Sequence, residues 1–336
     1  MIVALLGRIA AGERLSREEA AGLAECFLEG EASDAQIGAA LMGMAVRGET
    51  SDELAGLAIG MRRRALSVAT RHERFIDTAG TGGDGAGTFN ISTAAAFVIA
   101  AAGLPVAKHG NRAASSRSGS SDVLQALGVR PDLPPEAASA CLDELGICFL
   151  FAPLYHPATR RVADVRRQLG VRTAFNLIGP LTNPAGAPLQ VIGVYDGASV
   201  GRVAEAAAAV GVGRAWVVHG GGLDELSVTS PTEIAEVRGA EVARRMRVTP
   251  EELGLPRYDI GELRGGGPEE NAAVIEGVLS GEVRGARRDV VLLNAAAGLV
   301  VGEVVASLGE GMTRAAGAVD GGAALDLLRR LRERAP

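Results

Sequence analysis

The sequence is poor in aromatic residues, cysteine and histidine. Phe, Trp and Tyr together make up 3% of the 336 residues, so a buried core must be built mainly from Ala, Val, Leu and Ile. The three cysteines are an odd number without a C-x-x-C pair, and the four histidines form no H-E-x-x-H motif. These absences exclude a disulfide framework and a structural zinc site, and they predict three reduced, buried thiols.

Long hydrophobic runs and an excess of positive charge are also absent. The longest apolar stretch, residues 94–107, includes Gly103 and Pro105 and is shorter than the about 20 residues of a membrane span. The first 12 residues lack the charged n-region of a secretory signal. A net charge of -6 is unlike that of proteins that coat nucleic acid. We therefore expect a cytoplasmic protein that binds neither membrane nor nucleic acid.

Apolar residues are plentiful, at 47% of the chain, and the length predicts one large domain or two. Three helices are predicted within residues 1–72, because Ser16, Ser33 and Thr50 each precede a segment with helical spacing of apolar residues. Three short helices rarely bury enough surface alone. We expect them to form a small helical domain, joined by helices near residues 160–185, that packs on the rest of the chain or on another subunit.

From Phe75 onward, short apolar strands alternate with helical segments. Strands are predicted at residues 75–77, 105–108, 147–151, 190–195 and 215–218. This alternation is typical of a largely parallel sheet covered by helices. The sequence therefore predicts an α/β protein, with a helical domain at residues 1–72 and a larger α/β domain with a mainly parallel central sheet at residues 73–336.

A glycine-rich loop, residues 77–85, lies between a predicted strand and a predicted helix N-terminus, where free N–H groups and the helix dipole favour an anion. Its G-x-G-x-x-G spacing suggests a dinucleotide fold, but the next strand ends in Lys108 instead of an acidic residue. No lysine stands before a Ser or Thr as in a P-loop. A tight turn without a ligand is the alternative, which the nearby hydroxyls of Thr88, Ser92 and Thr93 disfavour.

A second loop, residues 108–121, concentrates hydrogen-bond donors: one Lys, two Arg, five Ser and one Asn. It also follows a predicted strand, and ligands bind at the carboxyl ends of strands in α/β sheets. A solvated polar loop is the alternative. Together the two loops predict a ligand that bears more than one phosphate.

Two further segments contain candidate site residues, which the two anion-binding loops make more specific. Asp224 and Glu225 follow a predicted strand, and adjacent carboxylates beside two anion loops suggest Mg²⁺. The segment from His156 to Ala185 contains Arg166 and the run R-T-A-F-N-L-I-G-P-L-T-N-P. By themselves, an arginine in a helix is mostly solvated, an Asp-Glu pair is mostly a helix start, and a lone histidine is mostly structural.

The motifs G-T-G-G-D at 80–84, N-I-S-T at 90–93, K-H-G-N-R-A-A-S-S at 108–116 and R-T-x-F-N-L-x-G-P-L-x-N-P at 172–184 occur in the order seen in one family. Together they resemble the anthranilate phosphoribosyltransferases over nearly the whole chain. The resemblance implies the nucleoside phosphorylase/phosphoribosyltransferase type of α/β fold. It also implies the Mg²⁺-dependent second step of tryptophan biosynthesis. In that step, the 5-phosphoribosyl group of 5-phosphoribosyl pyrophosphate (PRPP) is transferred to the amino group of anthranilate, and pyrophosphate leaves.

The resemblance also implies roles for individual residues. PRPP is expected to contact Gly80, Gly83, Asp84, Thr88, Asn90, Ile91, Ser92, Thr93, Lys108, His109, Gly110, Asn111, Arg112, Ala113, Ala114, Ser115, Ser116 and Ser120. Anthranilate is expected to contact Gly80, Asn111 and Arg166, with His109 and His156 lining its approach. Two Mg²⁺ ions are expected at Ser92, Asp224 and Glu225. A homodimer through the N-terminal helices is implied as well.

Physical chemistry is consistent with this assignment. Substrate phosphates need compensating cations and backbone donors in a low-dielectric cleft. An aromatic amine is already neutral at pH 7, so positioning and metal electrostatics should matter more than a catalytic base, and no catalytic side chain is assigned. The alternatives are a pyrimidine nucleoside phosphorylase, whose lysine loop differs from residues 108–111, and a non-catalytic relative that binds nucleic acid.

Overall fold

Four helices form at the N-terminus of the chain, three of them where the sequence predicts them. The computed structural model describes residues 1–113 and 117–335. Helices α2 (Arg17–Glu29), α3 (Asp34–Arg47) and α4 (Ser51–Arg63) each begin at a capping box. The fourth, α1 (Ile2–Ala10), was not predicted; it lacks a side-chain cap and is anchored by buried Leu5 and Ile9.

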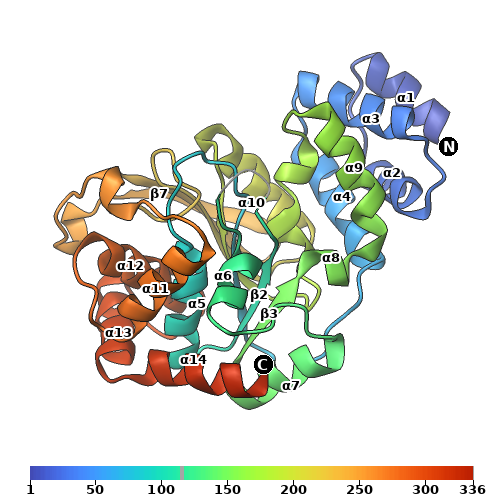
Figure 1. Ribbon diagram of the computed structural model, residues 1–336. Coiled ribbons are helices and arrows are strands. Elements are labelled where there is room, and N and C mark those ends of the chain that lie inside the picture. The colour runs from blue at the N-terminus through green and yellow to red at the C-terminus, as the bar shows by residue number, and fades with distance from the viewer. Residues whose placement is uncertain (114–116, 336) are drawn as a thin grey trace.

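A later helix completes this helical domain. Helix α9 (Arg160–Leu169) lies against α2 and α3 (Figure 1) and contributes Val162 and Val165 to their apolar core. The short 3₁₀ segments η2 (Ala174–Asn176) and η3 (Gly179–Thr182) follow α9, and η3 packs against α4. The chain thus returns to the helical domain between its third and fourth strands.

The predicted mainly parallel sheet is confirmed. Seven strands lie in the order β3-β2-β1-β4-β5-β6-β7, and the first five pair in parallel. Strand bounds match the prediction to within three residues: β1 (Ile76–Gly80), β2 (Val106–Gly110), β3 (Ile147–Phe151), β4 (Leu189–Gly193) and β5 (Arg214–His219).

An antiparallel hairpin that the sequence analysis did not predict extends the sheet beyond β5. It consists of β6 (Thr232–Arg238) and the edge strand β7 (Glu241–Val248). The buried carboxylate of Glu236 on β6 pairs with Arg214 on β5 and with Arg244 on β7. This ion-pair network links the hairpin to the parallel strands.

Helices cover both faces of the sheet. One face packs against α5 (Ile91–Ala101) and the C-terminal helices, and the other packs against α10 (Val200–Ala209), which in turn contacts α4 (Figure 1). The remaining helices are α6 (Ser120–Ala126), α7 (Pro135–Leu145), α8 (Ala152–Tyr155), α11 (Pro268–Leu279), α12 (Ala286–Val301), α13 (Leu308–Asp320) and α14 (Ala323–Arg334). Within residues 1–113 and 117–335, no helix combines the length and apolar character needed to cross a bilayer.

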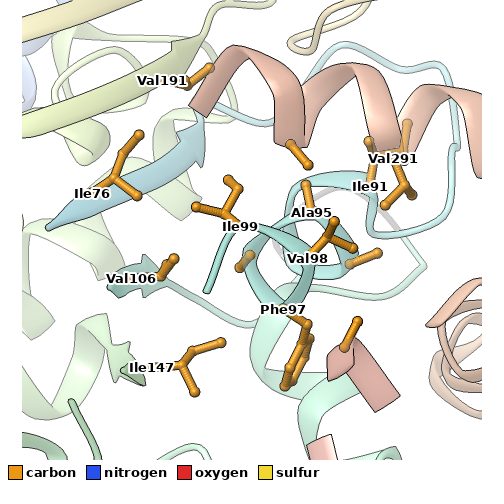
Figure 2. Packing of buried hydrophobic residues seen from close by; sticks show 14 of the residues in the cluster. Ile76, Ile91, Ala95, Phe97, Val98, Ile99, Val106, Ile147, Val191 and Val291 are labelled. Carbon is orange, nitrogen blue, oxygen red and sulfur yellow. The ribbon is translucent and has the colours of Figure 1, made fainter. Parts of the chain in front are cut away.

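The core beneath the strand ends is dense and aliphatic. Figure 2 shows Ile76, Val106 and Ile147 of three neighbouring strands on the side of α5, and Val191 of β4 beside α12. A Cβ added at Gly298 of α12 would lie 2.5 Å from Ile99 Cδ1, so the two helices pack with little space between them. This packing fixes the N-terminus of α5 relative to the carboxyl ends of the strands.

Close packing also holds α4 to α2. A Cβ at Gly56 would lie 2.6 Å from Ala20 Cβ and would also meet the Arg17 carbonyl oxygen. We predict that Gly56→Ala destabilises the protein by about 1–3 kcal/mol, although alanine favours a helix. Gly317→Ala in α13, where the added Cβ meets no atom within 4 Å, is the control. Urea unfolding measures both, and equal stability of the two variants would refute the packing argument.

Candidate active site

The strand order places a crevice between β1 and β4. The chain proceeds from β1 to β2 and β3 on one side, and from β4 to β5 on the other. Ligands of open α/β sheets bind outside the carboxyl ends of the strands at such a switch point. A small cavity opens there, lined by residues of both strands and of α5 and by Glu225. The candidate site therefore lies where the ends of β1 and β4, the start of α5 and the acidic pair meet.

Asp224 occupies this position because two glycines leave room for it. A Cβ at Gly80, at the end of β1, would lie 2.8 Å from Asp224 Cγ, and one at Gly193, at the end of β4, would overlap the Asp224 backbone. The N–H of Gly82 donates a hydrogen bond of 2.7 Å to Asp224 Oδ2. No larger residue fits at either strand end without displacing the carboxylate.

Three carboxyl groups gather at this point. Asp84 lies beside Asp224, and Glu225 Oε1 accepts a hydrogen bond of 3.1 Å from the N–H of Ser92 at the start of α5. Burial, followed by the charge of Asp84, raises the pKa of Asp224 to about 6, and burial with the Asp224 charge raises the pKa of Glu225 to about 8. Such a cluster favours the binding of a cation.

The donor set suits Mg²⁺. Two carboxylates and the Ser92 hydroxyl are hard oxygen ligands, and Mg²⁺ takes one or two carboxylates while keeping waters and phosphate oxygens. Among the described residues, no group of three or more His, Cys, Asp or Glu side chains could hold a metal ion by itself. An ion held here would therefore complete its coordination with water and substrate oxygens.

Lys108 is buried at the end of β2 beside this cluster. Its Nζ donates to the Thr78 carbonyl and, at 3.2 Å, to Ser92 Oγ. Burial lowers the pKa of Lys108, while the charges of Asp77, Glu225 and Asp224 oppose that shift. Lys108 therefore interacts electrostatically with Asp224 and Glu225.

Asp77 was not among the predicted site residues, although it lies under the site. Its Oδ1 accepts from the N–H of His109 at 3.0 Å, and its Oδ2 accepts from Asn183 Nδ2 at 2.8 Å. Burial raises the pKa of Asp77 to about 6, although the charge of Lys108 opposes the shift. Asp77 and Asn183 tie β1, β2 and η3 together. The only sequence signal was an acidic residue inside an apolar strand.

Backbone N–H groups without a partner among the described residues occur in two segments of the site. In the glycine loop, the N–H groups of Gly83, Asp84 and Gly85 donate to no described residue, and neither does that of Thr93 in the first turn of α5. Asn90, at the N-cap of α5, accepts from Asn271 Nδ2 at 3.0 Å and donates to the Ser118 carbonyl. The glycine loop is further fixed by the bridge between Thr88 and Arg264. These donors form an anion site.

The lysine loop turns back on itself after β2. Asp122 Oδ2 accepts from the N–H groups of Ala113 and Gly119, and Ser120 Oγ hydrogen-bonds the backbone of Asn111. Arg112 lies over the Phe151 ring. The predicted PRPP contacts Ala114, Ser115 and Ser116 lie outside the described residues. Gly110 approaches Ser120 so closely that a Cβ would collide with it.

His109, which follows Lys108 in β2, lies against His156. Their ring centroids are 5.3 Å apart, and His156 Nε2 lies 3.0 Å from the Thr182 carbonyl. Burial lowers the pKa of His109 to about 3 and that of His156 to about 4. Both rings are therefore neutral at pH 7, and the buried His109 Nε2 has no partner among the described residues.

Arg166 stands apart from the phosphate loops, on α9 of the helical domain. Its guanidinium lies 5.7 Å from the centroid of the Phe175 ring and pairs with no described acidic group. Burial lowers its pKa, with no opposing charge. The structure thus joins Gly80, Asp84, Ser92, Lys108, Asp224 and Glu225 by direct contacts, and presents Arg166 as an unpaired cation on a separate element.

The fold and this crevice define a glycosyltransferase with a separate helical domain. Residues 72–325 match the family described as "Glycosyl transferase family, a/b domain", and residues 3–65 match its helical bundle domain. Similar proteins include the anthranilate phosphoribosyltransferases of Pelotomaculum thermopropionicum, with 52% identity over 99% of this chain and 96% of that one, and of Anaeromyxobacter sp. strain K, with 52% identity over 98% of each.

Solved structures agree. The anthranilate phosphoribosyltransferase of Thermus thermophilus is 44% identical, with a TM-score of 0.94 over 98% of both chains. That of Saccharomyces cerevisiae, solved in complex with PRPP and Mg, is 26% identical, with a TM-score of 0.91 over 99% of this chain and 97% of that one. The chain belongs to the anthranilate phosphoribosyltransferase family, and the nucleoside phosphorylase and nucleic-acid-binding alternatives are not favoured.

The buried histidines make stability depend on pH. The pKa of His156 lies near 4 instead of 6.5, so between these values the unfolded chain binds a proton that the folded chain does not. Stability therefore falls as the pH drops from 6.5 towards 4, by up to about 3 kcal/mol for this group. We predict that His156→Gln flattens this pH slope in urea unfolding, with His72→Gln as the control. An unchanged slope would contradict a buried, neutral His156.

Proposed function

We propose that the chain transfers the 5-phosphoribosyl group of PRPP to the amino group of anthranilate, giving N-(5-phosphoribosyl)anthranilate and pyrophosphate in the second step of tryptophan biosynthesis. The observation that carries this proposal is the crevice at the switch point. There the glycine loop, Lys108 and the pair Asp224–Glu225 face the start of α5. Family membership at about 50% identity supports the same reaction.

The glycine loop and Lys108 would hold the phosphates of PRPP. The unpaired N–H groups at Gly83 to Gly85 and at Thr93 suit phosphate oxygens. Asn90 to Thr93 and the described part of the lysine loop would position the ribose and its phosphate. Asn271, which is bound to Asn90, keeps that side chain in place.

Asp224, Glu225 and the Ser92 hydroxyl would hold Mg²⁺, as two ions by family resemblance. Bound there, Mg²⁺ supplies compensation for the negative charge that builds on departing pyrophosphate. The yeast relative has been solved with PRPP and Mg, which supports the assignment. Burial raises the pKa of both carboxyl groups, and a bound cation would favour their ionised form.

Anthranilate would approach from the side of the helical domain. Arg166 carries an unpaired guanidinium, whose planar fork suits a carboxylate. Gly80 and Asn111 would contact the ring, and His109 and His156 would line the approach. Both histidines are neutral at pH 7, so they would not attract the carboxylate away from Arg166. The aromatic amine is itself neutral, so no general base is assigned.

A homodimer is also proposed, through α1 and α3. Val3 is 71% exposed and Val46 is 77% exposed, and Met1 and Met42 add to the apolar surface of the same two helices. Sedimentation should give about twice the chain mass of 34.3 kDa, and a monomer at micromolar concentration would refute the dimer. We further propose a cytoplasmic location, which suits the three buried free thiols.

Loss of anthranilate fluorescence on addition of PRPP tests the reaction itself. We predict loss with Mg²⁺ and none with a chelator. Asp224→Asn should shift the Mg²⁺ dependence to higher concentration and lower the maximal rate by at least about 10-fold, because one charge of the metal site is lost. No loss in a folded sample would refute the function. An unchanged Mg²⁺ response in Asp224→Asn would refute the metal assignment.

Arg166→Ala tests the anthranilate site. We predict that the anthranilate KM rises by about 10-fold to 100-fold, because a charge-assisted hydrogen bond is lost, while the KM of PRPP changes little. Steady-state kinetics with each substrate varied in turn measure both constants. Equal changes in the two constants would remove Arg166 from this role.

A further inference from the structure

Arg172 links the segment after α9 to the glycine loop, although the two are far apart in the sequence. It lies between α9, which carries Arg166, and η2. Its Nη2 donates a hydrogen bond to the carbonyl of Gly83 in the glycine loop. Its guanidinium lies 4.0 Å from the centroid of the Tyr195 ring. The segment that follows α9, the helix of the proposed anthranilate-binding Arg166, thus contacts the glycine loop that is proposed to bind phosphate.

Tyr195 supports this arrangement from the end of β4. Its ring lies beneath the guanidinium, and its N–H donates a hydrogen bond of 3.1 Å to Thr81 Oγ1. The N–H of Thr81 in turn donates to the Gly193 carbonyl at 2.9 Å. We call the set Arg172, Tyr195, Thr81 and Gly83 the Arg172 clasp. It connects the glycine loop to β4 by backbone, hydroxyl and cation–π contacts.

The clasp has a geometric consequence for the next residue. The described residues contain no cis peptide bond, so the carbonyl of Gly83 and the N–H of Asp84 point in opposite directions across one planar unit. Arg172 holds the carbonyl on its own side. The N–H of Asp84 therefore points away from Arg172, and it donates to no described residue.

Gly83 alone would not fix this peptide. Its φ is 77°, and the nearby Gly82 and Gly85 have φ of 66° and 75°, a region that glycine enters without steric cost. The hydrogen bond from Arg172 to the Gly83 carbonyl restricts the rotation of this peptide. Arg172 pairs with no described acidic group, so its charge is available for this hydrogen bond.

We propose that Arg172 is a positioning residue for PRPP, which orients the Asp84 N–H towards the phosphates by holding the Gly83 carbonyl. The proposal rests on the proposed function. Arg166 and Arg172 are six residues apart, yet they serve different substrates: Arg166 the carboxylate of anthranilate, and Arg172 the phosphates of PRPP through the glycine loop.

The test is a comparison of arginine variants. We predict that Arg172→Ala raises the KM of PRPP by about 10-fold to 100-fold, the range expected for a lost hydrogen bond to a charged donor, and leaves the anthranilate KM within about 3-fold. Arg166→Ala should show the opposite pattern. Arg167→Ala is the matched control, because the Arg167 side chain is 77% exposed and its one acidic partner among the described residues is Asp164 on its own helix. Arg172→Lys should restore part of the loss.

Calorimetry with PRPP and Mg²⁺, without anthranilate, separates this inference from the function. Arg172→Ala should bind PRPP at least about 10-fold more weakly than the unchanged protein, with the same thermal unfolding. If the unchanged protein neither binds PRPP nor consumes anthranilate, the proposed function fails. If it does both and Arg172→Ala binds PRPP equally well, or raises only the anthranilate KM, the positioning role fails.

Tyr195→Leu provides an independent check. Removal of the ring should weaken PRPP binding in the same direction by a smaller factor, since an exposed cation–π contact is weaker than the charged hydrogen bond. The double variant Arg172→Ala/Tyr195→Leu should be no weaker than Arg172→Ala alone, because both changes open the same clasp. Fully additive losses would show that the two residues act separately and would overturn the clasp.

Discussion

The close approach of Asp224 to Gly80 and Gly193 is the constraint on which the site depends. The Asp224 carboxylate thereby lies over the ends of β1 and β4. A side chain at Gly80 or at Gly193 would displace Asp224. Glu225 then reaches the start of α5, and Lys108 lies between the acidic pair and the Thr78 carbonyl. Because burial raises the pKa of both carboxyl groups, the arrangement favours a bound cation and a polyanionic substrate.

The helical domain carries Arg166, the residue proposed to bind the second substrate. Helix α9 leaves the α/β domain after β3, packs on α2 and α3, and returns through η2 and η3. Arg62 on α4 donates to the carbonyls of Leu181 and Val210 and so holds the two domains in register. Arg166 is thereby positioned by packing within the helical domain, and not by the strands that form the crevice.

Local signals predicted the loops, and long-range contacts account for what was missed. Capping residues and glycine runs act within a few residues, so α2 and the glycine loop could be placed from the sequence. Asp77 acquires its role from Asn183, 106 residues away, which no local pattern indicates. Strand β7 exposes most of its side chains and is rich in arginine, so its sequence gives a weak strand signal, and Glu236 on β6 pairs with its Arg244.

The separation of Lys108 and the metal site from Arg166 would also reduce the repulsion between the two anionic substrates of the proposed reaction. Anthranilate and PRPP are both anions, so their charged ends repel when the amine approaches the ribose. In the proposed reaction, Lys108, the metal site and the glycine loop would serve one substrate, and Arg166 on another domain would serve the other. The neutral rings of His109 and His156 add no charge between them. Holding the two charges on opposite sides leaves the uncharged amine facing the ribose, so catalysis can depend on positioning instead of proton transfer.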